Sequence, residues 1–147
     1  MQRALSPVLD AVGIRGHWVS SDTMAGLGAH KGAYMLALDL RRPAALHIAK
    51  FAGCTLAPGR YLYLGSARGP GGIGARLKRH FRQDKALHWH IDHLTTKAHG
   101  MAALAVPDGN ECALQEALLA RPEFEIGLEG FGSTDCRRCR SHLLHQK

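Results

Sequence analysis

Residues 59–80 constrain the fold of this chain more than any other stretch, because their pattern changes from strand to helix across one short turn. Residues 60–65 alternate aromatic and aliphatic side chains and predict a half-buried strand. Glycines crowd residues 69–74 and predict a turn. An apolar stripe with the i, i+4, i+8 spacing of one helix face follows, formed by Ile73, Leu77 and Phe81. The stretch therefore predicts a strand, a glycine-rich turn and a basic helix that deliver their side chains to one small region.

The rest of the chain also mixes strands with helices. Further strands are predicted at residues 33–40, 46–51 and 101–106, with a turn at residues 56–59. Helices are predicted at residues 87–94 and 111–120, with a shorter one around residues 6–12. The first 30 residues are otherwise a weakly specified lead-in, and residues 31–147 are predicted to form one domain. The expected fold class is α/β (α+β).

The composition is that of an ordinary globular protein. The chain has 147 residues, of which 46% are hydrophobic and 21% charged, so it can bury a core as one domain. No apolar run approaches the roughly 20 residues that cross a bilayer, and residues 1–10 lack the apolar stretch of a signal peptide. We therefore expect a cytoplasmic protein with no membrane partner, in which the four cysteines are reduced.

The charge balance favours a polyanionic partner. The 19 lysines and arginines against 12 aspartates and glutamates give a net charge of +7 at pH 7. Such an excess attracts phosphate groups, so nucleic acid is the expected partner. A merely basic soluble enzyme is the alternative that charge alone leaves open.

The glycine turn has three interpretations. Residues 69–74 match the dinucleotide-binding pattern G-x-G-x-x-G, but three residues separate the strand from the first glycine, and the chain is short for two nucleotide-binding halves. A nucleotide-binding enzyme is therefore the lower alternative. The glycines can also simply relieve backbone strain. The basic charge favours a third interpretation, in which the loop approaches a phosphate backbone between flanking basic residues, namely Arg68, Arg76, Lys78 and Arg79.

The strand and the helix beside this turn carry side chains suited to phosphate chemistry. Tyr61, Tyr63 and Gly65 share one face of the strand. Arg76 and His80 are four residues apart and project from one helix face, at the rim of the apolar stripe. A guanidinium can bind a phosphate through two parallel hydrogen bonds, and an imidazole can exchange a proton near neutral pH. The group suits the binding or cleavage of a phosphodiester.

Three motifs in this order resemble the GIY-YIG nuclease superfamily, namely Gly32-Ala-Tyr34, Tyr63-Leu-Gly65 and Arg76-x-x-x-His80. The closer similarity is to its Uri-like branch, a small uncharacterised family that occurs alone or fused to archaeal endonuclease III. Residues 87–94, 131–136 and 141–143 also resemble that branch, so the similarity covers residues 32–143. Ala33 and Leu64 replace isoleucines of the common pattern, and the gap between the second tyrosine and the arginine is a few residues longer.

The resemblance implies a small mixed, mainly antiparallel sheet flanked by helices. It also implies an endonuclease that hydrolyses phosphodiester bonds, in DNA first and RNA second, with one Mg²⁺ or Mn²⁺ ion. The catalytic residues that it implies are Tyr34, Tyr63, Arg76 and His80. A nucleic-acid-binding module that keeps the fold without catalysis is the alternative.

The superfamily places a metal-binding glutamate on a later helix, and residues 111–120 offer two candidates. Glu111 shares the helix face of Leu114 and Leu118, which is the face expected to be buried. Glu116 points to the opposite side. We expect Glu111 to hold the ion, with Glu116 as the second choice. A capping role for Glu111 is the alternative to metal binding.

Histidines and cysteines are frequent toward the C-terminus. If residues 87–94 form a helix, their histidines project from different faces, so local spacing forms no three-histidine metal site. His88 is expected to contribute to a substrate-side wall, and hydrogen-bonded histidines beside Trp89 are the alternative. By the resemblance, Asp135 and His142 border the active site.

The series Cys136-x-x-Cys139-x-x-His142-x-x-His145 contains ligand types that zinc accepts. Its spacing is unusual and no second Cys-x-x-Cys completes the ligand set. A structural zinc at Cys136 and Cys139 is therefore disfavoured. The arginines between these ligands are expected to extend a nucleic-acid surface.

Overall fold

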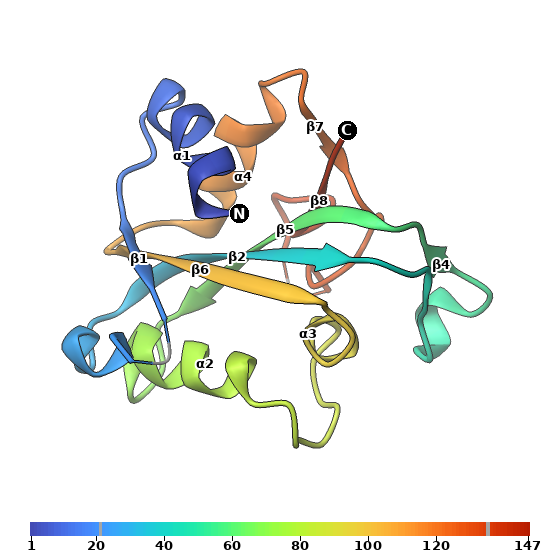
Figure 1. The fold of residues 1–147 in the computed structure, drawn as a ribbon, viewed down its shortest axis with the longest axis horizontal. Helices are drawn as coiled ribbons and strands as arrows, with labels where there is room; N and C mark the ends of the chain where they lie inside the picture. The colour runs from blue at the N-terminus through green and yellow to red at the C-terminus, as the bar shows by residue number, and fades with distance from the viewer. Residues whose placement is uncertain (21, 135) are drawn as a thin grey trace.

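The computed structural model describes residues 1–20, 22–134 and 136–147, apart from the side chain of Ala25. Its centre is a six-stranded sheet with the strand order β1-β6-β2-β5-β8-β7, in which each neighbouring pair is antiparallel (Figure 1). The strands are β1 (His17–Val19), β2 (Gly32–Leu40), β5 (Gly59–Ala67), β6 (Gly100–Pro107), β7 (Phe124–Ile126) and β8 (Leu143–Gln146). The expected fold class, a mainly antiparallel sheet flanked by helices, is confirmed.

The two longest strands form the middle of the sheet. β2 and β5 pair along their whole length, from Gly32 opposite Ala67 to Leu40 opposite Gly59. Because β2 is covered on both faces, it is apolar almost throughout instead of alternating with polar residues. These strands and β6 confirm the strands predicted at residues 33–40, 60–65 and 101–106.

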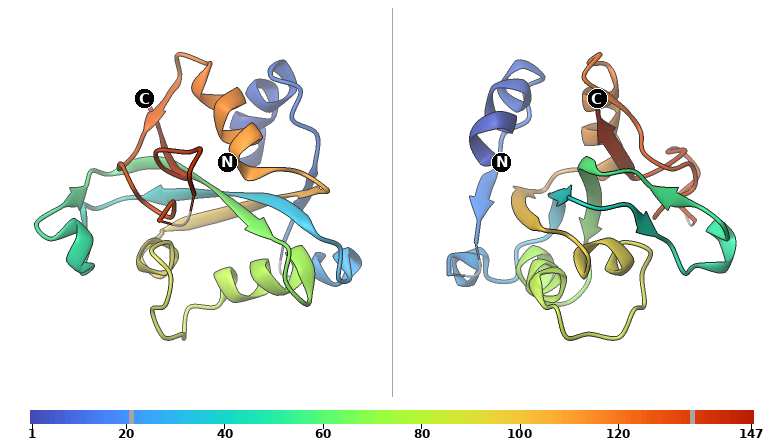
Figure 2. Two further views of the ribbon diagram at one scale, coloured as in Figure 1. Left: turned by 180° about the vertical axis from the view of Figure 1, so that it is seen from behind. Right: turned by 45° about the vertical axis from the view of Figure 1, so that its right-hand side comes forward.

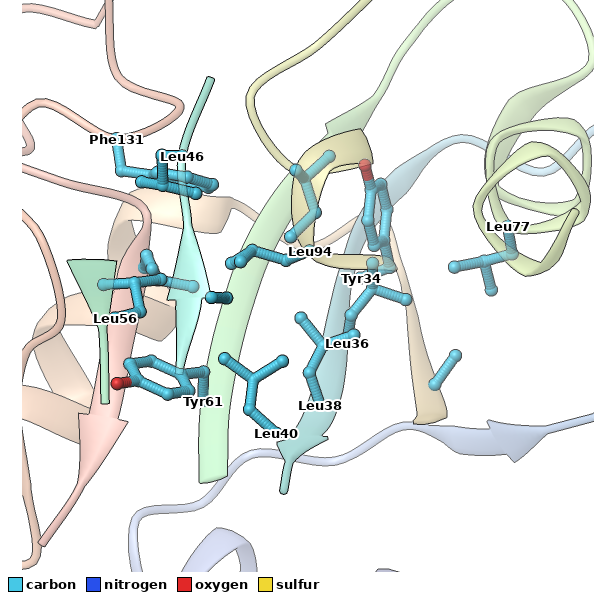
Figure 3. Close-up of a cluster of buried hydrophobic side chains, with 14 of the residues drawn as sticks. Tyr34, Leu36, Leu38, Leu40, Leu46, Leu56, Tyr61, Leu77, Leu94 and Phe131 are labelled. Atoms are coloured by element: carbon cyan, nitrogen blue, oxygen red, sulfur yellow. The ribbon is translucent and has the colours of Figure 1, made fainter. Parts of the chain in front are cut away.

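Helices cover both faces of the sheet (Figures 1 and 2). The helices α1 (Gln2–Ala11) and α4 (Glu111–Leu119) lie on one face, and α2 (Gly72–Phe81) and α3 (Asp92–Thr95) on the other. Two apolar clusters result, one on each face. The cluster on the α2 face includes Leu36 and Leu38 of β2, Leu77 of α2 and Leu94 of α3 (Figure 3). Tyr34 belongs to the same cluster, so its hydroxyl group is carried into an otherwise apolar layer.

The strand predicted at residues 46–51 is wrong. A projecting arm takes its place, in which the two-residue strands β3 (Ala44–Ala45) and β4 (Thr55–Leu56) pair and a 3₁₀ turn, Ala49–Phe51, lies between them (Figure 1). Leu46 and Phe51 are both buried and lie five residues apart. In a regular strand this spacing would place their side chains on opposite faces, whereas a turn lets both be buried on the same side. Only residues 57 and 58 remain of the turn predicted at residues 56–59, because Leu56 ends β4 and Gly59 begins β5.

The helix predicted at residues 87–94 is also largely wrong, since α3 begins only at Asp92. The Asp92 carboxylate accepts the backbone N–H groups of His88 and Trp89, both at 2.8 Å. A side chain that binds the preceding backbone in this way competes with helical hydrogen bonds and sets the start of a helix. The helical spacing from which the directions of these histidines were expected therefore does not apply to residues 88–91.

The first 30 residues contain more structure than the weakly specified lead-in that their pattern suggests. Leu5 and Leu9 of α1 are buried on the face of the sheet that α4 also covers, and β1 pairs with β6. A short 3₁₀ helix, Met24–Leu27, then packs against α2. The domain boundary at residue 31 stays a prediction. Among the described residues, no helix has the length and the apolar character needed to cross a membrane.

Candidate active site

The ring of Tyr34 lies across the backbone of Gly65, its cross-strand partner in the β2–β5 pairing. A Cβ atom at residue 65 would overlap this ring. The glycine of the Tyr63-Leu-Gly65 motif is thus required by close packing and not by a turn, since its backbone is ordinary strand. The same contact aims the Tyr34 hydroxyl toward α2.

Tyr34 and His80 form a buried hydrogen-bonded pair. The Tyr34 hydroxyl lies 2.7 Å from Nε2 of His80, and the two side chains belong to residues only 2% and 1% exposed. Burial lowers the pKa of His80 to about 3, helped by the nearby Lys85, so the imidazole is neutral at pH 7. Burial likewise raises the pKa of Tyr34 well above its usual value. Both groups are therefore neutral at pH 7, and a hydrogen bond joins the phenolic oxygen to Nε2 of the imidazole.

Tyr63 and Arg76 lie beside this pair. The Tyr63 ring centroid is 6.4 Å from that of Tyr34, and burial raises the pKa of the Tyr63 hydroxyl to about 12. The guanidinium of Arg76 lies 4.4 Å from the centroid of the Trp89 ring, a cation–π contact that engages its flat face and leaves its N–H groups at the edge. Arg76 is thereby held in position while it can still donate to an anion.

The buried carboxylate of Asp92 binds groups next to Arg76 and Trp89 and so helps to hold these two side chains in place. Asp92 is 0% exposed and accepts two hydrogen bonds from Arg79, at 3.2 and 2.9 Å. Burial alone would raise the pKa of Asp92, but the N–H groups of Trp89 and His88 and the Arg79 guanidinium together lower it. Arg79, expected to bind substrate, thus has an internal partner. Lys85 caps the end of α2 by donating to the carbonyl groups of Arg79 and His80.

Glu111 reaches the same site from the other side of the sheet. It begins α4, and the capping role considered for it belongs to Asn110, whose side chain accepts the N–H of Ala113 at 3.0 Å. The Oε2 atom of Glu111 is buried and has no hydrogen-bond partner among the described residues. An unpaired buried carboxylate oxygen is costly, and a cation is the partner that would satisfy it. Glu116 points away and pairs with Arg138 at the surface, 52% exposed.

These groups meet in one cavity of about 430 Å³. Six of the residues predicted from the sequence line it, namely Tyr34, Tyr63, Arg76, His88, Glu111 and His142. His80 lies directly behind Tyr34. The cavity also includes Trp89 and Cys136, for which the sequence suggested no place in the site. Trp89 could have been found, because an aspartate three residues after an aromatic residue suits a local side-chain–backbone turn that fixes the ring.

The other predicted residues lie elsewhere. Arg68 is exposed and donates to the carbonyl of Gly109 at 3.5 Å, and Lys78 borders a separate hollow next to Met24. Asp135 lies outside the described residues. The basic cluster predicted around the glycine turn is thus divided, and only its Arg76 lines the 430 Å³ cavity.

The glycines of the turn itself serve packing. Gly72 has φ of +62°, and a Cβ there would overlap the backbone carbonyl groups of Ala29 and His30. The N–H of Ile73, at the start of α2, donates to the carbonyl of His30 at 2.8 Å. The turn therefore fastens α2 to the N-terminal segment, and this N–H group is not free to bind a nucleotide phosphate.

The comparison with protein families gives one match, a model of a domain of unknown function called DUF123, over residues 33–147. Comparisons with curated proteins and with solved structures gave no significant match. The matched residues include all of β2 except Gly32, every later strand and each residue that lines the cavity. The chain belongs to the DUF123 family, a GIY-YIG-like family.

Proposed function

We propose that this protein is a metal-dependent endonuclease of the Uri-like GIY-YIG branch, which hydrolyses phosphodiester bonds in DNA or, as the second substrate class, RNA. The observation that carries the proposal is the convergence of Tyr34, Tyr63, Arg76 and Glu111 on one cavity, with His80 hydrogen-bonded to Tyr34. These residues come from β2, from the consecutive elements β5 and α2, and from α4, so three separate parts of the chain contribute to the cavity. An unpaired buried carboxylate oxygen in a cavity that an arginine also lines suits the binding of a cation and an anion together.

Glu111 fits a hard divalent cation. Mg²⁺ and Mn²⁺ prefer oxygen ligands and keep part of their water shell, so one carboxylate facing a polar cavity suffices on the protein side. When bound, such an ion would polarise the phosphate and stabilise the leaving oxygen. The orphaned Oε2 of Glu111 is the atom available for it.

Tyr34 and His80 are arranged to move a proton. Tyr34 lines the cavity, and its hydroxyl lies 2.7 Å from Nε2 of His80, which accepts the phenol proton when the imidazole carries its own proton on Nδ1. A water molecule that attacks a phosphate can pass a proton to the phenolic oxygen as the phenol passes its own to the imidazole. The negative charge of a bound phosphodiester raises the pKa of His80 from its low value and makes this transfer easier. Tyr63 lies close enough to adjust the same step.

Arg76 would bind the scissile phosphate. Its guanidinium is stacked on Trp89 and borders the cavity, so it neutralises charge on the phosphate without first having to be ordered. The net charge of +7 would add attraction along the rest of the nucleic acid.

The test is cleavage of labelled single-stranded, duplex and branched DNA and of RNA, with Mg²⁺, Mn²⁺ or EDTA. We expect cleavage that EDTA abolishes, and a loss of about 100-fold or more in Tyr34→Phe and in Glu111→Gln. Glu116→Gln is the matched control on the same helix and should cleave as the wild type does. Substrates that stay intact but shift on a gel would identify a binding module instead. Cleavage at the wild-type rate in both active-site variants would contradict the proposed residues.

A further inference from the structure

Four metal-binding side chains from two distant segments meet beside the cavity. Cys112 belongs to the first turn of α4, and the other three, Cys136, Cys139 and His142, lie between β7 and β8. Their ligand atoms all lie within 4.8 Å of one another. Cys112, Cys139 and His142 are buried, with 5%, 7% and 7% of their surface exposed, and Cys136 is half-buried.

The distances within this cluster suit one shared ion. In tetrahedral zinc sites the Zn–S and Zn–N distances of about 2.3 and 2.1 Å place two sulfur atoms about 3.8 Å apart and a sulfur and a nitrogen atom about 3.6 Å apart, and separations within about 0.4 Å of these values need only a small adjustment to share one ion. The Cys112 and Cys136 sulfur atoms are 3.4 Å apart, and the Cys112 sulfur is 3.8 Å from Nε2 of His142. A disulfide between Cys112 and Cys136 would use two of the four side chains and leave the convergence of Cys139 and His142 unexplained.

We propose that Cys112, Cys136, Cys139 and His142 bind a zinc ion. Thiolate and imidazole ligands in a closed, four-membered set are typical of structural zinc, whereas Mg²⁺ and Mn²⁺ prefer oxygen. The fourth ligand, whose absence from the local spacing disfavoured zinc, is Cys112, which lies 24 residues before Cys136 and comes from another element. The N–H of Cys139 donates to the Cys136 sulfur at 3.3 Å, a contact that supports a thiolate.

His145, the other histidine of the C-terminal series, is not part of the site. It lies on β8, where its Nδ1 atom is 3.0 Å from the Glu125 carboxylate and its ring packs against Tyr61. Cys54 lies outside the cluster as well. The chain thus provides one histidine and one cysteine as matched controls.

The zinc ion would join the segment between β7 and β8 to α4, next to the residue proposed to hold the catalytic cation. Cys112 directly follows Glu111, and Cys136 and His142 line the cavity. The ion pairs on this segment are exposed, Arg138 with Glu116 and Arg140 with Glu129, and exposed pairs stabilise little. A buried hydrogen bond from Gln115 of α4 to the Ser141 carbonyl, 2.7 Å long, already joins the segment to this helix, and a metal cross-link would add four further bonds at the same junction. The assignment depends on the ligand geometry alone and not on the proposed nuclease activity.

The first experiment measures the metal content of the full chain purified without chelator. We expect close to one zinc ion per chain, falling to less than about a tenth of that in Cys112→Ser and in Cys139→Ser. Cys54→Ser, His145→Gln and Glu111→Gln should retain zinc, and the last of these separates this site from the proposed catalytic one. Co²⁺ in place of zinc should show thiolate charge-transfer absorption in the wild type and in all three controls.

A second measurement uses the wild type and does not depend on how the variants fold. Removal of zinc by a chelator should lower the Tm by on the order of 10 °C, and addition of zinc should restore it. The proposal is overturned if the wild type binds neither zinc nor Co²⁺, if Cys112→Ser keeps full zinc, or if iron occupies the site. A Cys112–Cys136 disulfide in the freshly purified protein, shown by thiol titration, would also overturn it.

Discussion

The two sides of the cavity are built in different ways. On one side, Tyr34, Tyr63 and Arg76 come from β2, β5 and α2, and the ion pair behind them, between Arg79 and Asp92, includes a carboxylate with no exposed surface. We refer to this side as the regular wall. The other side, the loop wall, consists of residues 127–134 and 136–142, which contain no helix or strand. Its ion pairs lie in solvent, with side chains between 52% and 69% exposed.

The difference shows what each wall needs in order to keep its shape. Buried ion pairs cannot lose one member without a large cost, because the remaining charge stays in a medium of low polarity. Exposed pairs are screened by water and contribute about 0–1 kcal/mol. The regular wall is therefore fixed by packing and by the hydrogen bonds of Asp92. The loop wall depends on the buried side chains that join it to α4, which is where we propose the zinc ion.

The largest effect is expected from a change to the buried ion pair. Asp92→Asn leaves the Arg79 charge without its partner and weakens the two backbone hydrogen bonds to residues 88 and 89. It should lower the free energy of unfolding by about 3 kcal/mol, measured by denaturant titration at pH 7. Glu129→Gln, which breaks the exposed pair with Arg140, should leave it almost unchanged because water screens that pair. Equal losses in the two variants would show that the walls are not held by different means.

The same division explains which parts of the site could be predicted from the sequence. The regular wall was accessible because its information is local. Alternation places Tyr63 and Gly65 on one strand face, and a four-residue step places Arg76 and His80 on one helix face. The sheet and α2 follow from these patterns, and Glu111 was placed by helical spacing on the inward face of α4.

The loop wall was not accessible in this way. The ligand set joins Cys112 to residues 24 to 30 positions later. No periodic pattern links them, because the described residues between β7 and β8 form no helix or strand. The error at residues 87–94 has a similar cause. A single side chain, Asp92, takes the N–H groups of the preceding residues and delays the start of the helix. One side-chain contact there outweighs the helical spacing of a whole segment.

An intermediate effect is expected where Tyr34 packs on the backbone of β5. Gly65→Ala places a methyl group into the Tyr34 ring and should lower the free energy of unfolding by about 2 kcal/mol. The displaced ring would also weaken the hydrogen bond to His80, so nucleolytic activity should fall with stability. Gly69→Ala is the matched control, because nothing lies within 4 Å of a Cβ at that position. Both substitutions reduce the conformational entropy of the unfolded chain to the same extent. The difference between their free energies of unfolding therefore measures the overlap with the Tyr34 ring. A Gly65→Ala protein as stable as Gly69→Ala would contradict the tight packing of the regular wall.

The smallest expected effect is the pH dependence that His80, in the regular wall, gives to the free energy of unfolding. The pKa of His80 is about 3 in the folded protein and near 6.5 in the unfolded chain, so between these values the unfolded chain binds the additional proton. The stabilisation that the neutral His80 imidazole gives the folded protein is complete above pH 6.5 and is lost as the pH falls toward 3. At pH 5.5 the loss attributable to His80 is on the order of 1 kcal/mol relative to pH 7.5.

In His80→Gln this part of the pH dependence should disappear, while the other histidines are common to both proteins and cancel in the comparison. Urea titrations of wild type and variant at the two pH values measure the difference. It should be the same before and after zinc is removed, because His80 lies in the regular wall and contacts Tyr34, not the cysteine cluster. An identical pH dependence in the two proteins would mean that the pKa of His80 in the folded protein is no lower than in the unfolded chain, which would contradict the burial of its imidazole behind Tyr34.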